Sequence, residues 1–204
     1  RQITHEGSFG LVWAKTTLLE GVRTIKEFGR SAANVGEKMA SKPETFCSEN
    51  FNFEDFISCS ETFQNGSIEN TPVLVETYEF IRQLANDILE PCLSEFGSLK
   101  LTYGFCGKNL SRAIKKVNGG IYPPLDQHAG MELNTSGDLI CPRGGMAADF
   151  HCLPVISLQV AKFVVKTLPF DRLYFYGNSR PIHVSVNAEP STQIVIMKKM
   201  NTRV

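Results

Sequence analysis

The stretch that decides the fold is Gly-Met-Ala-Ala-Asp-Phe at residues 145–150, taken together with Ile-His-Val-Ser-Val at residues 182–186. The second segment alternates apolar and polar residues, as a half-buried β-strand does, so His183 and Ser185 share one face. The small residues before Asp149 leave room for a neighbouring strand or a metal ion to approach the backbone. We therefore expect His183 to point away from the apolar layer and into a cleft.

A third segment, Asp-Gln-His at residues 126–128, supplies a second imidazole. His128, Asp149 and His183 are candidate zinc ligands, because zinc binds imidazole nitrogen and carboxylate oxygen. Three protein ligands leave the fourth position to water, which zinc makes acidic near neutral pH. Taken singly, a histidine in an apolar strand or an aspartate near a turn is more often structural. No HExxH or CxxC motif is present, so the prediction depends on the set.

From about residue 54 to residue 186 the chain resembles the zinc D-alanyl-D-alanine carboxypeptidases, peptidase family M15, whose fold is shared with the Hedgehog signalling domain. The resemblance rests on five segments in order, residues 101–105, 126–128, 145–149, 170–174 and 182–185. It implies a zinc ion held by His128, Asp149 and His183, and a peptide substrate.

The chain departs from that family in three places. Residues 131–143 are inserted between the histidine and the aspartate. Phe105 and Cys106 stand where the family usually has an arginine that holds substrate. Tyr176 stands where its catalytic glutamate precedes the last histidine, so the resemblance supports the metal site better than the peptidase activity.

The missing glutamate leaves the proton-transfer group open. Glu132 is our candidate base, with Asp138 and Asp126 as alternatives, and a solvated loop carboxylate is the competing explanation for each. Tyr176 can donate a hydrogen bond to an oxyanion, or simply pack within a strand. Arg180 can hold a substrate carboxylate or phosphate by a bidentate contact, or lie in an exposed turn.

Two functions of different classes fit these residues. The first is a zinc-dependent hydrolase that acts on a peptide bond through a zinc-activated water, with Zn²⁺ as cofactor and a peptide or small molecule as substrate. The alternative is a zinc-retaining, catalytically inactive binding module within a larger protein. The Hedgehog domain, which this fold resembles, uses such a scaffold for recognition.

The composition is that of an ordinary soluble domain. Among 204 residues, 42% are hydrophobic, and 21 basic residues balance 21 acidic ones. The balance gives no reason to expect nucleic acid as a partner. We find no apolar run of ~18 residues that would span a membrane and no signal peptide. The chain begins with Arg1, so we expect a fragment or a processed product of a longer protein, which leaves room for an additional domain before residue 1.

Six cysteines permit three disulfides, but a chain of this size has an ample core. We therefore expect reduced, partly buried thiols and a cytoplasmic location. A structural zinc built from cysteines near His151 is a weaker alternative.

The chain divides into two parts. We expect residues 1–45 to form an amphipathic helical appendage and linker, because Leu11, Leu18 and Val22 fall on one helical stripe. Residues 46–204 are expected to form the zinc peptidase-like domain. Its predicted fold is α+β, a small, mainly antiparallel sheet flanked by helices, of the Hedgehog or D-Ala-D-Ala-peptidase type.

Several elements of this domain are predictable. Thr71 and Pro72 favour the start of a long helix that Pro91 should kink and Gly97 should end. The insert should form a hairpin or flap. A further helix is expected at residues 155–166. Strands are expected at residues 99–103, 171–176, 181–186 and 193–197.

Overall fold

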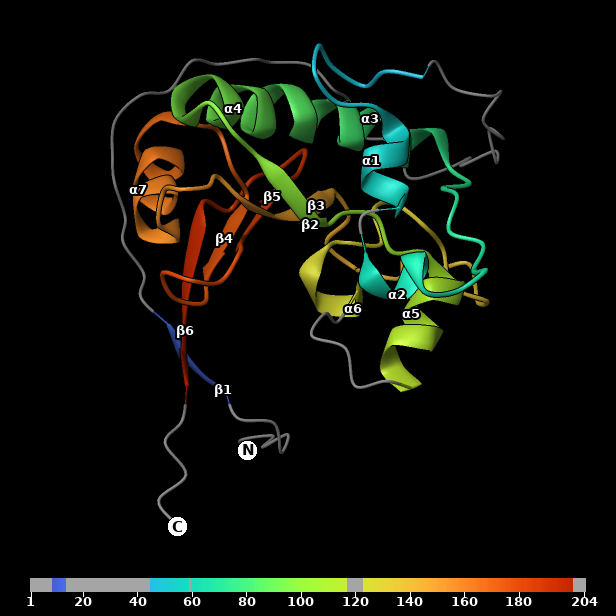
Figure 1. Ribbon diagram of the computed structural model, residues 1–204. Helices are drawn as coiled ribbons and strands as arrows, with labels where there is room; N and C mark the ends of the chain where they lie inside the picture. Colours follow the sequence, from blue (N-terminus) through green and yellow to red (C-terminus); the bar gives the residue numbers. More distant parts are fainter. Residues whose placement is uncertain (1–8, 14–44, 59, 117–122, 200–204) are drawn as a thin grey trace.

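A mixed β-sheet of six strands forms the centre of the molecule (Figure 1). The computed structural model describes residues 9–13, 45–58, 60–116 and 123–199. The strands are β1 (Phe9–Trp13), β2 (Lys100–Tyr103), β3 (Met146–His151), β4 (Arg172–Phe175), β5 (Ile182–Val186) and β6 (Gln193–Lys199). Their spatial order is β1-β6-β4-β5-β3-β2, with the parallel pair β4–β6 among antiparallel pairs. The prediction of an α+β fold with a mainly antiparallel sheet is confirmed.

The helices flank this sheet. They are α1 (Phe53–Ser58), α2 (Glu61–Gln64), α3 (Val75–Leu84), α4 (Glu90–Phe96), α5 (Lys108–Lys116), α6 (Pro123–Asp126) and α7 (Ser157–Thr167). A π-helical turn, η1 (Ala85–Leu89), joins α3 to α4 without a break. Pro91 lacks an amide N–H, and the widened turn ends directly before the helix that contains it. The irregularity expected at the proline therefore takes the form of a π turn.

One face of the sheet forms the hydrophobic core. Ile182, Val184 and Val186 of β5 are buried in the same cluster as the apolar residues of α3, η1, α4 and α7. In Figure 1 the α3–α4 helix lies over the sheet and α7 lies beside β4. The alternation predicted for residues 182–186 is thus confirmed, since His183 and Ser185 point to the opposite face.

The neighbouring strands β3 and β5 are close-packed at Gly145, the residue directly before β3. This glycine has a φ of 79°, and a Cβ atom built there would lie 2.1 Å from the Val186 carbonyl oxygen. Only glycine fits this position. Any other residue would place its Cβ against the Val186 carbonyl oxygen and would be strained by the left-handed backbone conformation. The close strand approach that the small residues before Asp149 predicted is therefore present.

Two sequence predictions about the N-terminal half are wrong. Helix α3 begins at Val75, not at Thr71, and its N-cap residue Leu74 makes no side-chain cap bond. Residues Phe9–Trp13 form an edge strand that pairs with β6, so the helix expected over residues 1–45 is absent there. The rest of residues 1–44 lies outside the described part of the chain.

The remaining global predictions concern the insert, the membrane and the thiols. The insert forms a hairpin, with an antiparallel bridge between Leu133 and Leu139. Among the described residues no helix has both the length and the apolar character to cross a membrane. Within the same ranges, five free and buried cysteines are present: Cys47, Cys92, Cys106, Cys141 and Cys152.

Candidate metal centre

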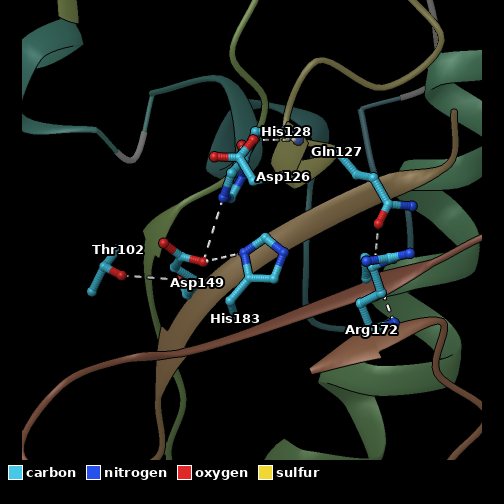
Figure 2. A network of polar contacts seen from close by, with 9 residues as sticks. Thr102, Asp126, Gln127, His128, Asp149, Arg172 and His183 are labelled. Carbon is cyan, nitrogen blue, oxygen red and sulfur yellow. Dashed lines mark hydrogen bonds and ion pairs between the residues drawn. The ribbon is translucent and has the colours of Figure 1, made fainter. Parts of the chain in front are cut away.

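His128, Asp149 and His183 come together on the polar face of the sheet (Figure 2). Asp149 and His183 are directly opposite each other on the antiparallel strands β3 and β5. His128 comes from the loop after α6, which lies over this face of the sheet. One potential ligand atom from each residue lies within 4.8 Å of the other two. The predicted set of ligands is therefore assembled, and no second such cluster occurs within the described ranges.

The donor atoms converge on one carboxylate oxygen. Asp149 Oδ1 lies 3.4 Å from His128 Nε2 and 2.8 Å from His183 Nδ1. The histidine side chains are 0% and 1% exposed, and that of Asp149 is 13% exposed. In a tetrahedral zinc site with bonds of ~2.0–2.1 Å, ligand atoms are about 3.3 Å apart. The three residues fit a small divalent ion after slight separation of the His183–Asp149 pair.

One of the two unsatisfied imidazole nitrogens of the site also fits a metal. His128 Nε2 and His183 Nε2 are both buried and have no hydrogen-bond partner. Buried polar atoms without partners are rare in folded proteins and require an explanation, of which a bound ion is one. A bound ion explains His128 Nε2, which faces the Asp149 carboxylate, but not His183 Nε2, because His183 faces that carboxylate with Nδ1.

His128 is oriented by its second ring nitrogen. Nδ1 donates to the carbonyl oxygen of Gly104 at 2.7 Å, which leaves Nε2 as the atom that could coordinate a metal ion. Gly104 itself packs against α1, because a Cβ there would lie 2.5 Å from the Phe56 carbonyl oxygen. The Cys106 amide donates to the His128 carbonyl oxygen, so both loops hold each other in register.

A buried amide ties the His128 loop to the sheet. Gln127 has a φ of 64° and is fully buried. Its Nε2 donates to the Gly144 carbonyl oxygen and to Asp171 Oδ2, while its Oε1 accepts from Ser185 Oγ. The residue next to the ligand is thereby bonded to β5 and to the segment before β3.

Electrostatics couple His128 to its acidic neighbours. Burial lowers the pKa of His128, but the negative charges of Asp126 and Asp149 and the hydrogen bonds outweigh it and raise the pKa to about 9. Burial raises the pKa of Asp149, but its interactions with His128 and His183 leave the pKa well below the ordinary value. Without metal, the site therefore holds a proton on His128 and a negative charge on Asp149.

Two aromatic rings and one hydrogen bond to the backbone support the three candidate ligands. The Tyr174 ring stacks on the His183 ring, with centroids 4.7 Å apart and planes 18° apart. The Tyr103 ring contacts His128 edge-on at 5.4 Å. Thr102 Oγ1 donates to the Asp149 carbonyl oxygen (Figure 2). These contacts restrict the rotamers of the ligands before any ion binds.

Glu132, the candidate base, serves the start of α3. Its Oε1 accepts hydrogen bonds from the Val73 and Leu74 amides and from Thr77 Oγ1, at 2.9–3.1 Å. The carboxylate thus replaces the cap that the sequence suggested for Thr71. These bonds fully explain why this residue is buried, and they favour a structural role over a catalytic one.

Of the other residues predicted for catalysis, two interact with the metal centre and two are exposed to solvent. Tyr176 follows β4, and burial together with the charges of Asp149 and Asp126 raises its pKa. Asp126 lies beside His128 and accepts a hydrogen bond from the His128 amide at 3.3 Å (Figure 2). Arg180 is exposed in the turn before β5, and Asp138 is exposed at the tip of the insert.

Sequence reasoning missed the supporting residues. The Gly104 carbonyl, the Tyr174 ring and the Gln127 amide gave no sequence signal, since backbone atoms and cross-strand neighbours depend on register. The strand β3 was not predicted as a strand either, although the small residues before Asp149 pointed to one close approach. Comparisons with family models, with curated proteins and with solved structures found no match to this chain.

Proposed function

We propose that this protein is a zinc-dependent hydrolase of the D-Ala-D-Ala carboxypeptidase type that cleaves a peptide bond. The observation that carries the proposal is the convergence of His128 Nε2, Asp149 Oδ1 and His183 Nδ1 in a nearly buried cluster. Two imidazoles and one carboxylate are a donor set that zinc prefers, and three protein ligands leave a position for water. Zinc held there would supply a water that ionises near neutral pH and would polarise a carbonyl group.

The fold assignment is part of the same proposal. The resemblance to peptidase family M15 and to the Hedgehog domain rests on five ordered sequence segments. It is supported by the adjacent antiparallel strands that present Asp149 and His183 to each other.

We propose Tyr176 as the hydrogen-bond donor in catalysis, because the charges of Asp149 and Asp126 act on its hydroxyl group. Its raised pKa keeps the phenol protonated at neutral pH, so it acts as a donor to an oxyanion and not as a base. Asp126 takes the role of base that we first gave to Glu132. It is a half-buried carboxylate within electrostatic reach of both His128 and Tyr176.

The second candidate function is a zinc-retaining binding module without catalysis. The hydrogen bonds that Glu132 accepts at the N-terminus of α3 favour this candidate, because they remove Glu132 as the first-choice catalytic base. Both candidates share the metal and differ in whether any peptide is cleaved.

Metal analysis tests the part that both candidates share. The purified protein should contain one zinc per chain, and His128→Ala and His183→Ala should each lose it. His151→Ala is the matched control, since His151 lies two residues from Asp149 but outside the cluster. Stoichiometric zinc in both ligand variants would refute the assignment.

A peptide-library assay on zinc-loaded protein separates the two candidates. For a hydrolase, Asp149→Ala should abolish cleavage. Loss of one oxyanion donor typically costs roughly 10²–10³-fold in kcat, and Tyr176→Phe should fall in that range. Glu132→Gln should cleave nearly as fast as the wild type. Folded, zinc-loaded protein that cleaves no peptide would leave the binding module as the function.

A further inference from the structure

We propose that the solvent-facing side of α5 is a docking surface for the phosphate backbone of a nucleic acid. Helix α5 reads Lys-Asn-Leu-Ser-Arg-Ala-Ile-Lys-Lys, so four of its nine residues are basic and none is acidic. The helix contributes no residue to the metal cluster. Binding of a nucleic acid there goes beyond the proposed hydrolase activity and does not require zinc.

The balanced total charge of the chain hides a strong segregation of charge along the sequence. Residues 43–95 contain eleven acidic residues and one basic residue, Arg82. Between Glu95 and Asp126 the order is reversed, with five basic residues and no acidic one. Helix α5 carries four of these five. A local field of one sign attracts a polyanion even when the net charge of the whole molecule is zero.

The apolar side of α5 fixes the helix to the rest of the molecule. Leu110 and Ile114 are 0% and 2% exposed and form a small core cluster with Cys106. Phe63 of α2 packs against the same cluster, and Figure 1 shows α5 next to α2. Side chains at i and i+4 share one face of a helix. The opposite face of α5 is therefore presented to solvent by a helix that is already held in place.

The basic side chains of α5 are available to a ligand. Arg112 and Lys115 are exposed, and Lys108 is half-buried. Within the described part of the chain, these three side chains form no ion pair and no hydrogen bond. Glu61, the acidic residue of the neighbouring helix α2, forms no ion pair with α5 either. The positive charge of α5 is therefore not neutralised by the described residues around it.

The spacing of these charges favours a regular polyanion. With a rise of about 1.5 Å per residue, Lys108 and Arg112 are about 6 Å apart along the helix axis, and Arg112 and Lys115 about 4.5 Å. A nucleic acid also presents its charges at regular intervals, about 3.4 Å apart on one strand when measured along a duplex. Lysine and arginine side chains that neutralise phosphates release condensed counterions, and this drives binding without reading the base sequence.

A membrane surface fits this helix less well. Helices that lie in a membrane interface combine basic residues with large apolar side chains that enter the lipid. On α5 the two large apolar residues, Leu110 and Ile114, are buried within the chain. Among the described residues, none of the exposed large hydrophobic side chains comes from α5. Anionic vesicles therefore serve as the competing ligand in the test.

Fluorescence anisotropy of a labelled DNA duplex, mixed with the full chain, tests the docking surface. With a duplex of about 20 base pairs at about 50 mM salt, we expect saturable binding, and log K should fall against log salt with a slope of roughly −2 to −3 for three phosphate contacts. Absence of saturable binding, or binding that salt does not weaken, would overturn the proposal. Tighter binding to phosphatidylserine vesicles than to the duplex would also overturn it, because the surface would then belong to a membrane.

Charge-removal variants then assign the binding to α5. Arg112→Gln combined with Lys115→Gln should weaken duplex binding by roughly tenfold at low salt and reduce the magnitude of the salt slope by about two. The matched control is Lys162→Gln combined with Lys166→Gln, which removes two exposed charges from α7, on the opposite side of the molecule in Figure 1. It should bind within about twofold of the wild type, because salt screens distant charges. Equal weakening in both double variants would show that only the net charge matters, and would overturn the assignment to α5.

The outcome is separable from that of the proposed function. Glutamine keeps the helix-forming tendency of lysine and arginine, so both double variants should match the circular dichroism of the wild type. Zinc content, measured on the same samples, should also match, since α5 holds no candidate ligand. Loss of duplex binding with fold and zinc retained would support the docking surface. Wild-type protein that binds the duplex but contains no zinc would support the docking surface and refute only the metal centre.

Discussion

His128 shows how one side chain is prepared for a metal by its surroundings. The Gly104 carbonyl fixes Nδ1, and Asp149 faces Nε2. The negative charges of Asp126 and of Asp149, the carboxylate that would share the metal, outweigh burial and raise the pKa of the imidazole to about 9. The proton therefore competes with the metal for Nε2 across the neutral range.

This competition predicts the pH dependence of zinc binding. Zinc affinity should rise by up to about tenfold per pH unit as the pH increases toward about 9, and should then level off. In metal-free protein the raised pKa stabilises the fold fully below the ordinary value of about 6.5, and this contribution disappears as the pH rises through about 9. The increase in Tm on zinc addition should therefore grow across that window.

Chelator-buffered zinc titrations at several pH values, followed by fluorescence and by Tm, would check this. The metal-free protein at each pH is the control for general pH effects. Affinity that stays constant across the window would contradict the assignment of His128 Nε2 as a ligand.

At the scale of the element, Gly145 governs how closely β3 and β5 approach. Gly145→Ala should lower the free energy of unfolding by roughly 1–3 kcal/mol for overpacking against Val186, beyond the backbone cost. Gly137→Ala is a matched control, because its φ of 85° is similar but nothing lies within 4 Å of the added carbon. It should cost only about 1 kcal/mol.

Chemical denaturation of both variants measures the difference. Equal losses of unfolding free energy in the two variants would show that β3 and β5 can move apart at little cost. Gly145→Ala should also reduce zinc affinity, since Asp149 and His183 face each other across the same pair of strands.

Helix α3 depends on a carboxylate that is distant in sequence. Glu132→Ala leaves the Val73 and Leu74 amides and the Thr77 hydroxyl without this acceptor, which should cost about 1–3 kcal/mol of stability. Glu79→Ala, at an exposed position on α3, should change stability by less than about 0.5 kcal/mol. Zinc content unchanged in both variants would support the structural role, and zinc loss in Glu132→Ala alone would argue against it.

These elements also show what the sequence can predict. The alternation of apolar and polar residues was sufficient to predict strand β5. The family resemblance brought together His128, Asp149 and His183 from separate segments as candidate ligands. The start of α3 was missed because its cap comes from Glu132 in an insert 59 residues from Val73. Local propensity at Thr71 carries no information about such a long-range hydrogen bond.

At the scale of the whole molecule, β1 adds an edge strand to the sheet by pairing with β6. Among the residues whose burial is described, the core cluster runs from Cys47 onward and includes the buried residues of β3 and β5. Protein lacking residues 1–45 should therefore still unfold cooperatively and bind one zinc. Its new edge strand, β6, should promote self-association, because exposed strand edges pair with other chains.

Calorimetry and analytical ultracentrifugation of the truncated protein would check both parts. The full chain at equal concentration is the control. Loss of the unfolding transition in monomeric truncated protein would show that residues 1–45 are integral to the domain.

The pairing of β1 with β6 has a consequence for the order of events during protein synthesis. Trp13 is paired with Val195, so the first strand waits for about 180 residues of translation before its partner leaves the ribosome. At ~5–20 residues per second this wait lasts roughly ten to forty seconds. The strands that carry Asp149 and His183 are synthesised before β6, so all three candidate ligands are part of the chain before the sheet can close at that edge.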